Sequence, residues 1–392
     1  MALKCGIIGV ANVGKSTLFN CMSSTRVETS SFAFTSNKSN VGVVNVPDPR
    51  LYHLEKFQST EKIIPATVEI VDIPGLTKGA SQGEGVGNKF LSDIRNTDAL
   101  VHVLRCFDDE QLPHIDGSVN PVRDIETINL ELQVKDLESV EKKMERLSKI
   151  AKSGDKDARR GLEVLEQYKA HLENFQNARS LELSETDRKH VEDLFLLTSK
   201  PVMYVCNVED EAATTGNAYV EQVREYLATE AGEAESEAGE AGSEAGEARS
   251  EAGEARSEAG ILVLAARLES EIAELEDEAD RREFLADAGL EEPGVNKLIR
   301  SAYSMLNLIS FFTIGPKEIR AWTIRRGALA PQAAGAIHSD LQRGFIRAEV
   351  MKYEDFVSLG SEQACKDKGK LAVEGKNYVV QEADILHIRF NV

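Results

Sequence analysis

The residues with the clearest chemical potential lie near the N-terminus, in the run Gly9-Val10-Ala11-Asn12-Val13-Gly14-Lys15-Ser16. This run has the spacing GxxxxGK(S/T) and follows an apolar segment. In such a loop the glycines let backbone amides wrap around phosphate groups, and the N-terminus of the next helix attracts their charge. Lys15 is expected to reach the β- and γ-phosphates, and the Ser16 hydroxyl to bind Mg²⁺. The nucleotide contacts predicted here are Asn12, Val13, Gly14, Lys15, Ser16 and Thr17.

A second motif, Asp72-Ile73-Pro74-Gly75, ends a strongly apolar segment further along the chain. An aspartate at a strand end can hold Mg²⁺ through water, and the amide of the glycine can contact the γ-phosphate. We therefore expect Asp72 to be a metal ligand. Gly75 and Lys15 are expected to take part in catalysis.

Two further positions bear on the hydrolytic step. Between the first two motifs, Phe34-Thr35-Ser36-Asn37 offers hydroxyl groups that could close on the metal, and spacing alone leaves Thr35 and Ser36 as equal candidates. Leu76 stands where Ras-like GTPases carry a glutamine that orients the attacking water. Because leucine cannot orient water, either the enzyme is slow or another group, or a partner, positions the water.

The base-recognition position is predicted at Asn207-Val208-Glu209-Asp210. The guanine-specific pattern is Asn-Lys-x-Asp, in which the lysine covers the base and the aspartate accepts hydrogen bonds from guanine. Val208 replaces that lysine, so the residues alone leave guanine selectivity open. Asn207, Val208 and Asp210 are the nucleotide contacts predicted in this segment.

Five short apolar runs are the predicted strands that position these motifs. Runs rich in valine, isoleucine and leucine, separated by helix-length segments, are typical of buried parallel strands in a doubly wound α/β sheet. The runs are Lys4–Gly9, Thr67–Ile73, Ala99–Leu104, Val202–Cys206 and Ile261–Ala265. The predicted P-loop domain covers residues 1–124 and 200–285.

Residues 125–199 are predicted to form a helical coiled-coil arm inserted into that domain. Apolar residues recur at helical spacing on both sides of a turn-like segment at 152–155, which predicts two antiparallel amphipathic helices. A long crossover packed on the sheet is the alternative. Residues 232–260 contain a seven-residue Ser-Glu-Ala-Gly repeat without leucine, isoleucine or valine, so no coiled-coil seam can form. We expect a solvated insert there, flexible or partly helical.

Residues 305–392 are predicted to form a separate α+β domain. Its strand-like pieces are Ile309–Thr313, Ala321–Ile324, Asn377–Val380 and Ile385–Phe390. The chain has a net charge of −20, so contact with RNA would require a local basic surface. This domain offers one in Arg320, Arg325, Arg326, Arg343 and Arg347. A solvated face without a partner is the alternative.

Composition favours a cytoplasmic protein. The sequence has no apolar stretch long enough to span a membrane, and the N-terminus lacks the features of a signal peptide. The five cysteines are scattered without a CxxC pair, which is typical of reduced core thiols rather than of disulfides or a zinc site. We expect no membrane contact and a monomer.

These motifs together resemble the YchF family, a branch of the Obg-related GTPases that prefers ATP. The resemblance covers nearly the whole chain outside the repeat. The matching segments are KCGIIGVANVGKSTLFN, NVGVVNVPDPRL, VEIVDIPGLTKGASQGEGVGNKFLSDIRNTDALVHVLRCF, GFIRAEVMKYEDF and the closing HIRFNV. The resemblance implies a P-loop ATPase core, a coiled-coil arm and a C-terminal TGS domain with a ubiquitin-like sheet.

The resemblance also assigns roles to individual residues. It places the Mg²⁺-binding switch hydroxyl on Ser36 and the water-positioning group on His114, in a flexible loop. On residue type alone, a lone loop histidine is more often just solvent-exposed. Phe107 and Val208 match positions near the adenine, and Asn12 matches an asparagine that binds K⁺ in related GTPases. Asp210 departs from the family's glutamate, and Ala11 from its usual proline.

The predicted function is therefore a ribosome-binding regulatory ATPase that uses Mg²⁺ and acts in translation and stress control. The resemblance implies the ribosome as partner, through its large subunit and the 70S particle. A GTPase with the same partner is one alternative, because Asp210 moves the motif toward the guanine type. The other is a nucleotide-gated binding protein whose turnover is incidental, which Leu76 favours.

Overall fold

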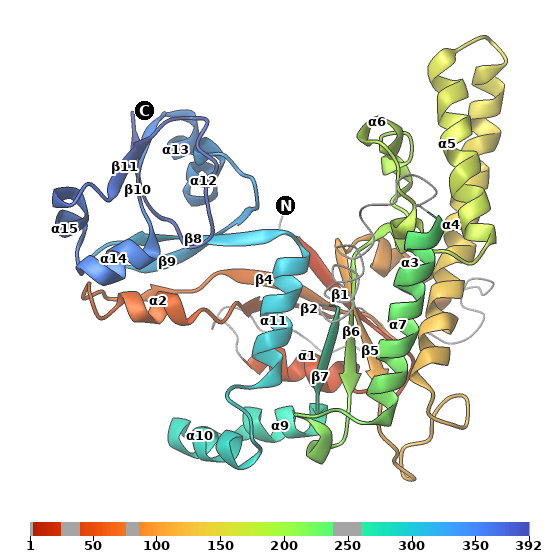
Figure 1. The fold of residues 1–392 in the computed structure, drawn as a ribbon, viewed down its shortest axis with the longest axis horizontal. Coiled ribbons are helices and arrows are strands. Elements are labelled where there is room, and N and C mark those ends of the chain that lie inside the picture. Colours follow the sequence, from red (N-terminus) through yellow and green to blue (C-terminus); the bar gives the residue numbers. More distant parts are fainter. Residues whose placement is uncertain (1–2, 25–39, 76–85, 238–259, 392) are drawn as a thin grey trace. The chain divides into compact units, whose positions relative to one another are not determined.

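The computed structural model describes residues 3–24, 40–75, 86–237 and 260–391 (Figure 1). The described residues form two compact units. The first lies within 3–24, 40–42 and 70–295, and the second within 43–69 and 296–392. Residues 46–66, between two strands of the first sheet, thus group with the C-terminal residues, an association that the sequence analysis did not predict.

The first unit contains a doubly wound α/β sheet, as predicted. Its strands follow the order β2-β4-β1-β5-β6-β7. The strand bounds are β1 Lys4–Ile8, β2 Asn40–Asn45, β4 Thr67–Asp72, β5 Ala99–Arg105, β6 Val202–Asn207 and β7 Ile261–Leu264. Strands β1, β5, β6 and β7 pair in parallel, and every residue of β5 is buried. This burial on both faces explains why the strands read as continuous apolar runs.

Helices accompany these strands. They are α1 Lys15–Ser24, α3 Val86–Arg95, α7 Ala218–Glu237, α9 Ala266–Glu274 and α10 Glu278–Asp287. Residues 232–237 of the predicted insert continue α7, and residues 238–259 lie outside the described part of the chain. Strand β2 was missed because Asn40, Gly42 and Asn45 interrupt its apolar pattern, as expected for a half-exposed strand at the end of the sheet order.

A helical hairpin is inserted between β5 and β6. It consists of α4 Pro121–Ala151 and α5 Lys156–Glu173, which lie side by side and extend away from the sheet (Figure 1). Asn120 caps α4 by accepting from the Arg123 amide, and Asp155 caps α5 by accepting from the Ala158 amide. Val140, Val164, Leu165, Tyr168 and Leu172 belong to the apolar cluster between the helices.

Asp136 fastens the hairpin to the segment that returns to β6. Its carboxylate is fully buried and accepts from the Leu197 amide at 2.7 Å, the Thr198 amide at 2.8 Å and the Thr198 hydroxyl at 2.6 Å. Burial raises the pKa of Asp136, against the lowering effect of these hydrogen bonds. The carboxylate is the acceptor for three buried donors, which otherwise would be unpaired.

The second unit contains a mixed six-stranded sheet with the order β11-β10-β12-β8-β9-β3. The strand bounds are β3 Ile63–Ile64, β8 Leu308–Ile314, β9 Ile319–Arg325, β10 Phe345–Met351, β11 Leu371–Glu374 and β12 Ile385–Phe390. The helices are α2 Pro49–Leu54, α11 Gly294–Met305, α12 Ala330–Ile337, α13 Ser339–Arg343, α14 Tyr353–Leu359 and α15 Glu362–Asp367. Strands β12 and β8 run parallel to each other at the centre of the sheet. Their outer neighbours, β10 beside β12 and β9 beside β8, run antiparallel to them. This arrangement agrees with the predicted ubiquitin-like α+β domain.

One predicted strand of this unit was wrong. Residues Asn377–Val380 form a turn and a single bridge from Val379 to Leu329, rather than a strand. The Tyr378 hydroxyl donates to the buried Asp384 carboxylate at 2.6 Å. Backbone bonds from the Ala330 amide to the Tyr378 carbonyl and from the Val380 amide to the Ala328 carbonyl complete the bridge without a regular strand. Strands β10 and β11 were missed because charged residues such as Arg347 and Glu349 alternate with the apolar positions.

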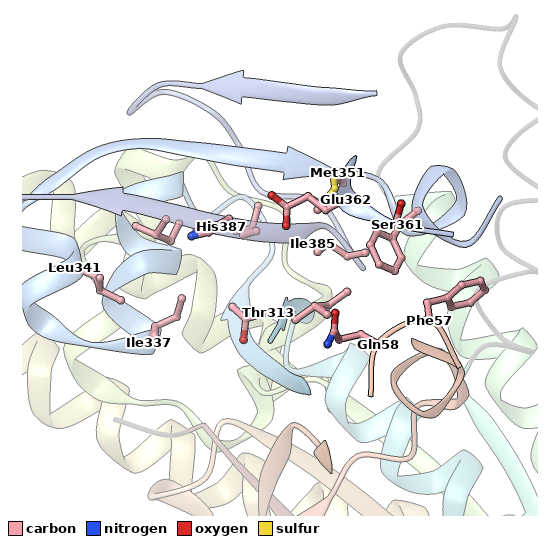
Figure 2. Close-up of a pocket in the computed structure, with 14 residues that line it drawn as sticks. Phe57, Gln58, Thr313, Ile337, Leu341, Met351, Ser361, Glu362, Ile385 and His387 are labelled. Carbon is pink, nitrogen blue, oxygen red and sulfur yellow. The ribbon is translucent and has the colours of Figure 1, made fainter. Parts of the chain in front are cut away.

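A pocket of about 260 Å³ lies in the second unit (Figure 2). Phe57, Ile337 and Leu341 supply apolar surface to it, and Glu362 and His387 supply polar atoms. None of the site residues predicted from the sequence lines this pocket. All five cysteines are free and buried, as predicted, and no described helix is long and apolar enough to cross a membrane.

Replacing Asp136 with alanine should destabilise the protein by about 3 kcal/mol, because it leaves three buried donors without their acceptor. The measurement is the denaturant midpoint of the helical signal. Glu141→Ala on the exposed face of the same helix is the control, and its midpoint should stay near that of the parent. Equal midpoints for the two variants would contradict this account of Asp136.

Candidate nucleotide-binding site

The predicted phosphate-binding loop joins β1 to α1. Gly9 and Gly14 have φ values of +149° and +97°, and Asn12 has a φ of 63°. A Cβ atom at Gly9 would lie 2.5 Å from the Val103 carbonyl oxygen, and one at Gly14 would lie 2.5 Å from Nδ2 of Asn207. Both glycines of the motif are therefore required by backbone conformation and by close approach.

Lys15 begins α1 and points back into the loop. Its Nζ donates to the Val10 carbonyl oxygen at 2.5 Å, and only 7% of the residue is exposed. Burial lowers the pKa of Lys15 to about 8, and the nearby Asp72 carboxylate partly offsets this effect. A cation buried among backbone carbonyls is well placed to exchange these contacts for phosphate oxygens.

The predicted metal ligands Ser16 and Asp72 lie together. Ser16 Oγ donates to Asp72 Oδ2 at 3.2 Å. Burial raises the pKa of Asp72, while the Ser16 hydrogen bond and the Lys15 charge lower it. A hydroxyl and a carboxylate side by side fit Mg²⁺, which prefers oxygen ligands and retains several of its waters. The third predicted ligand, Ser36, lies outside the described residues, as does Thr35.

Gly75 approaches the loop from the end of β4. A Cβ atom there would lie 3.1 Å from Lys15 Nζ and 3.2 Å from the Ala11 amide nitrogen. The backbone of Gly75 thus reaches the place where Lys15 and the loop meet, as expected for a γ-phosphate contact. Leu76 lies outside the described residues.

Asn207 joins the base-recognition segment to the phosphate-binding loop. It lies at the end of β6, its side chain is buried, and its Nδ2 donates to the Val13 carbonyl oxygen at 2.9 Å. Its Oδ1 accepts from the Ala266 amide, at the start of α9, at 2.8 Å. One amide group therefore fixes three segments of the site, and both of its ends are satisfied.

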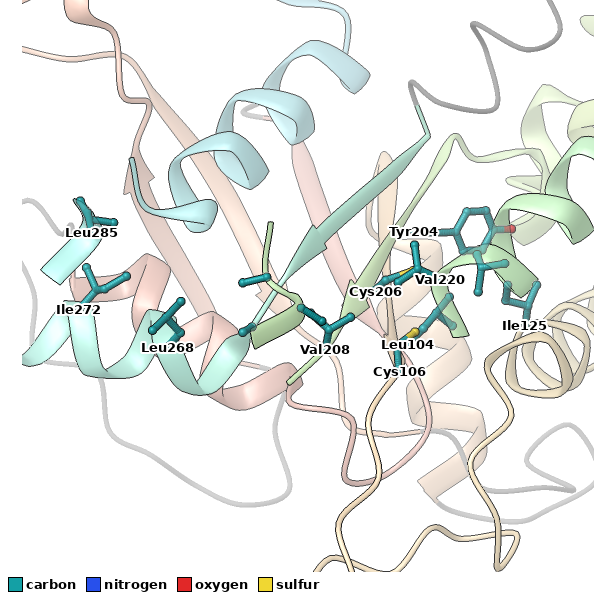
Figure 3. Packing of buried hydrophobic residues seen from close by; sticks show 14 residues of the cluster. Leu104, Cys106, Ile125, Tyr204, Cys206, Val208, Val220, Leu268, Ile272 and Leu285 are labelled. Carbon is teal, nitrogen blue, oxygen red and sulfur yellow. The ribbon is translucent and has the colours of Figure 1, made fainter. Parts of the chain in front are cut away.

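Val208 is part of a buried cluster next to this segment. It is 3% exposed and lies between Leu268 on one side and Leu104 and Cys106 on the other (Figure 3). The next motif residue, Asp210, begins a short 3-10 turn and lies 3.6 Å from the Arg267 guanidinium. Partial burial raises the pKa of Asp210, and Arg267 lowers it. The Asp210 carboxylate therefore lies beside a charged side chain, whereas the Val208 side chain lies in the apolar core.

A buried arginine, which the sequence analysis missed, shapes the loop that carries Phe107. Arg105 ends β5, is 1% exposed, and donates to the carbonyl oxygens of Phe107 at 3.1 Å, Leu112 at 2.6 Å and Asp109 at 3.2 Å. Its guanidinium lies 4.7 Å from the centroid of the Phe107 ring. The detectable signal was a charged residue at the end of an otherwise apolar strand.

His114 follows this loop and is buried, contrary to the solvent exposure expected for a lone loop histidine. Its Nε2 lies 3.0 Å from Asp124 Oδ2, and its Nδ1 accepts from the Asp116 amide at 3.1 Å. The second contact makes Nδ1 the acceptor and Nε2 the donor in a neutral ring. The preceding residue, Pro113, accepts from Asn12 Nδ2 at 3.4 Å, so the histidine loop contacts the phosphate-binding loop.

His114, Asp116 and Asp124 are close enough together to be considered as metal ligands. However, the Arg123 guanidinium lies 3.6 Å from Asp116 and 3.8 Å from Asp124, and so supplies positive charge to both carboxylates. We interpret the cluster as a hydrogen-bonded support for His114. Sequence reasoning missed Asp124 because the pair spans the start of α4 and depends on tertiary packing.

Comparison with known proteins gives family matches and full-length relatives. A family model described as "50S ribosome-binding GTPase" matches residues 4–150, and a C-terminal model of YchF GTPases, described as a protein of unknown function, matches residues 308–391. The "Ribosome-binding ATPase YchF" of Bacillus subtilis is 46% identical over 394 residues, and that of Haemophilus influenzae is 45% identical over 392 residues. Both alignments cover 100% of each chain.

A solved structure of a YchF protein has the same fold as this chain. The Schizosaccharomyces pombe YchF GTPase has a TM-score of 0.81 and 32% sequence identity, covering 99% of this chain and 97% of that one. Together with the full-length relatives, this establishes the family: the chain belongs to the YchF family of P-loop proteins.

Proposed function

We propose that this protein hydrolyses ATP with Mg²⁺ in the cytoplasm and binds the ribosome as a regulator of translation and stress responses. The observation that carries the proposal is the meeting of Lys15, Ser16, Asp72 and Gly75 at the phosphate-binding loop. The full-length relatives from Bacillus subtilis and Haemophilus influenzae, which are named ribosome-binding ATPases, support the same activity and partner.

Each residue of this group has a proposed task. Lys15 exchanges its contact with Val10 for phosphate oxygens, and the loop amides hold the remaining phosphate charge. Ser16 and Asp72, joined by Ser36, hold Mg²⁺, which neutralises charge on the phosphates when it is bound. Gly75 senses the γ-phosphate through its amide.

We also propose a second cation, an oligomeric state and a ribosomal partner. Asn12 is the candidate K⁺ ligand, and the protein works as a monomer on the large subunit and the 70S ribosome. A nucleotide-gated binding protein with incidental turnover is the competing function. It is favoured by Leu76, and by His114 being held in hydrogen bonds on both ring nitrogens.

The choice of nucleotide depends on two residues at the base end. Val208 stands where guanine-specific proteins have a lysine. Its side chain is buried in the core cluster, so position 208 offers no ammonium group to cover a guanine, and this favours ATP. Asp210 offers a carboxylate that could serve either base, and Phe107 adds a ring held by Arg105. We therefore propose ATP as the preferred substrate and GTP as the alternative.

Calorimetric titration of the nucleotide-free protein should show a Mg·ATP analogue binding about tenfold more tightly than the matched Mg·GTP analogue, a difference of about 1.4 kcal/mol. The physical reason is that position 208 carries a buried valine in place of the lysine that covers guanine. Asp210→Glu is the control, because it retains the carboxylate and should retain the preference. Tighter binding of the GTP analogue by the parent protein would make this chain a GTPase.

His114 is proposed to position the attacking water in place of the missing glutamine. In the structure it is held by Asp124 and by the Asp116 amide, so a ring nitrogen becomes available only when one of these contacts is exchanged. Its loop contacts the phosphate-binding loop through Pro113 and Asn12, which provides a route for nucleotide binding to move it.

His114→Ala should lower ribosome-stimulated ATP turnover by about a hundredfold, because positioned proton-transfer groups contribute on that scale, while leaving ATP affinity near the parent value. Asp124→Asn is the matched variant. It keeps an oxygen that can accept from Nε2, so its turnover should stay closer to the parent than that of His114→Ala. Unchanged turnover in His114→Ala would remove the histidine from the mechanism.

The C-terminal domain is proposed to contact RNA. Residues 305–392 contain twelve lysines and arginines against ten aspartates and glutamates, a net of +2 in a chain of −20. Arg343 pairs with Asp340 and Arg347 lies 3.6 Å from Glu349, so these charges are partly neutralised. Arg325 and Arg326 are exposed and have no carboxylate partner in the described part of the chain.

Reversing both charges in Arg325→Glu/Arg326→Glu should weaken co-sedimentation with ribosomes by about tenfold, because phosphate contacts supply most non-specific RNA affinity. Lys366→Glu/Lys368→Glu changes the total charge of the same domain equally and is the control. Equal binding by the parent and the arginine variant would remove this surface from the proposal.

A further inference from the structure

The far end of the helical hairpin is strongly basic. This segment, residues 142–160, is called the hairpin tip here and contains the last turns of α4, the connecting turn and the first turn of α5. It has eight lysines and arginines against three acidic residues, a net charge of +5. Because the whole chain carries −20, the tip has the opposite sign to the rest of the molecule.

Within the described part of the chain, most of these cations are not neutralised by ion pairs. Lys142, Lys143 and Arg160 have carboxylate partners within 4 Å. The other five have no such partner among the residues that the structure describes, and all five are exposed: Arg146, Lys149, Lys152, Lys156 and Arg159. Of the acidic residues of the tip, Asp155 is occupied as the cap of α5.

Helix electrostatics explains only part of this pattern. Lys149 and Lys152 lie at the C-terminus of α4, where the helix dipole favours cations. Lys156 and Arg159 lie in the first turn of α5, where the dipole disfavours them. The second pair therefore reduces the stability of its own helix, which points to a role outside the fold.

An exposed aromatic ring lies on the flank of the tip. Phe195 is 63% exposed and has a φ of 47°, a left-handed conformation that is unusual for a residue other than glycine. It borders a hollow of about 540 Å³ that is lined by the cations Lys143 and Lys189 and also by the carboxylates Asp157, Glu192 and Asp193. An exposed ring on the flank of a basic segment is suited to stacking on an unpaired base whose phosphates lie at the tip.

These features favour RNA over other polyanions. An anionic membrane would require an apolar face beside the charges, but the apolar face of each helix is buried in the hairpin cluster. An acidic protein would match the charges and leave the exposed ring unexplained. We propose that the hairpin tip binds the phosphate backbone of ribosomal RNA and that Phe195 stacks on a base beside it, an inference that rests on the proposed ribosomal function.

The test compares full-length variants in co-sedimentation with ribosomes and in filter binding to protein-free ribosomal RNA, across a salt series. Lys152→Glu/Lys156→Glu should bind both at least about tenfold more weakly, with the slope of log affinity against log salt smaller by about two. Phe195→Ala should weaken binding about tenfold without changing the slope. ATP turnover without ribosomes should equal that of the parent in both variants, which confirms an intact fold.

Arg224→Glu/Arg282→Glu is the control for total charge, because it makes the same change of charge at exposed positions of the same unit outside the hairpin. Its binding should remain within about twofold of the parent. Equal binding by the tip variant and the control would overturn the inference. A loss on ribosomes without a loss on protein-free RNA would assign the tip to a ribosomal protein and overturn it as well.

The co-sedimentation of the parent protein separates failure of the ribosomal function from failure of the hairpin-tip assignment. If the parent protein does not co-sediment with ribosomes, the proposed ribosomal function itself is wrong. If the parent binds and the tip variant binds equally well, the ribosomal function stands and only the assignment of the hairpin tip is wrong.

Discussion

The side-chain amide of Asn207 is the contact on which the geometry of the site depends. It donates to the phosphate-binding loop at Val13 and accepts from the first residue of α9, so it joins three segments far apart in the sequence. Its approach to the loop leaves no space for a Cβ atom at Gly14. Once the loop is fixed in this way, Lys15 and Ser16 begin α1. Asp72, the last residue of β4, then contacts Ser16, and Gly75, three residues later, approaches Lys15.

Much of the fold could be predicted because its signals are local. The strands of the first sheet are buried on both faces and read as short apolar runs, and the phosphate-binding motif has a spacing that its chemistry requires. The hairpin was also visible, since apolar residues recur at helical spacing around a glycine-containing turn. Strands with one exposed face were harder to predict, and β2, β10 and β11 were missed for that reason.

The rest of the site depends on contacts between residues distant in sequence. Nothing in the pattern around His114 reveals that Asp124 will lie 3.0 Å from it, because the first turn of α4 brings that carboxylate back to the loop. Arg105 is similar, since its three carbonyl acceptors are set by the path of the loop that it organises. Charge can be counted locally in the sequence: within a chain of −20, the C-terminal domain and the hairpin tip are both positive.

The burial of Val208 links the proposed nucleotide preference to the integrity of the fold. In many binding sites the residue that discriminates between ligands lies at the surface, and evolution can exchange it freely. Here that residue also fills part of a packed cluster with Leu104 and Leu268. A change to a long charged side chain would have to bring its ammonium group out to solvent while its stem replaced a compact β-branched core residue. Drift toward the other nucleotide would therefore require compensating changes in the neighbouring core, so within this architecture base preference should evolve slowly and together with its packing partners.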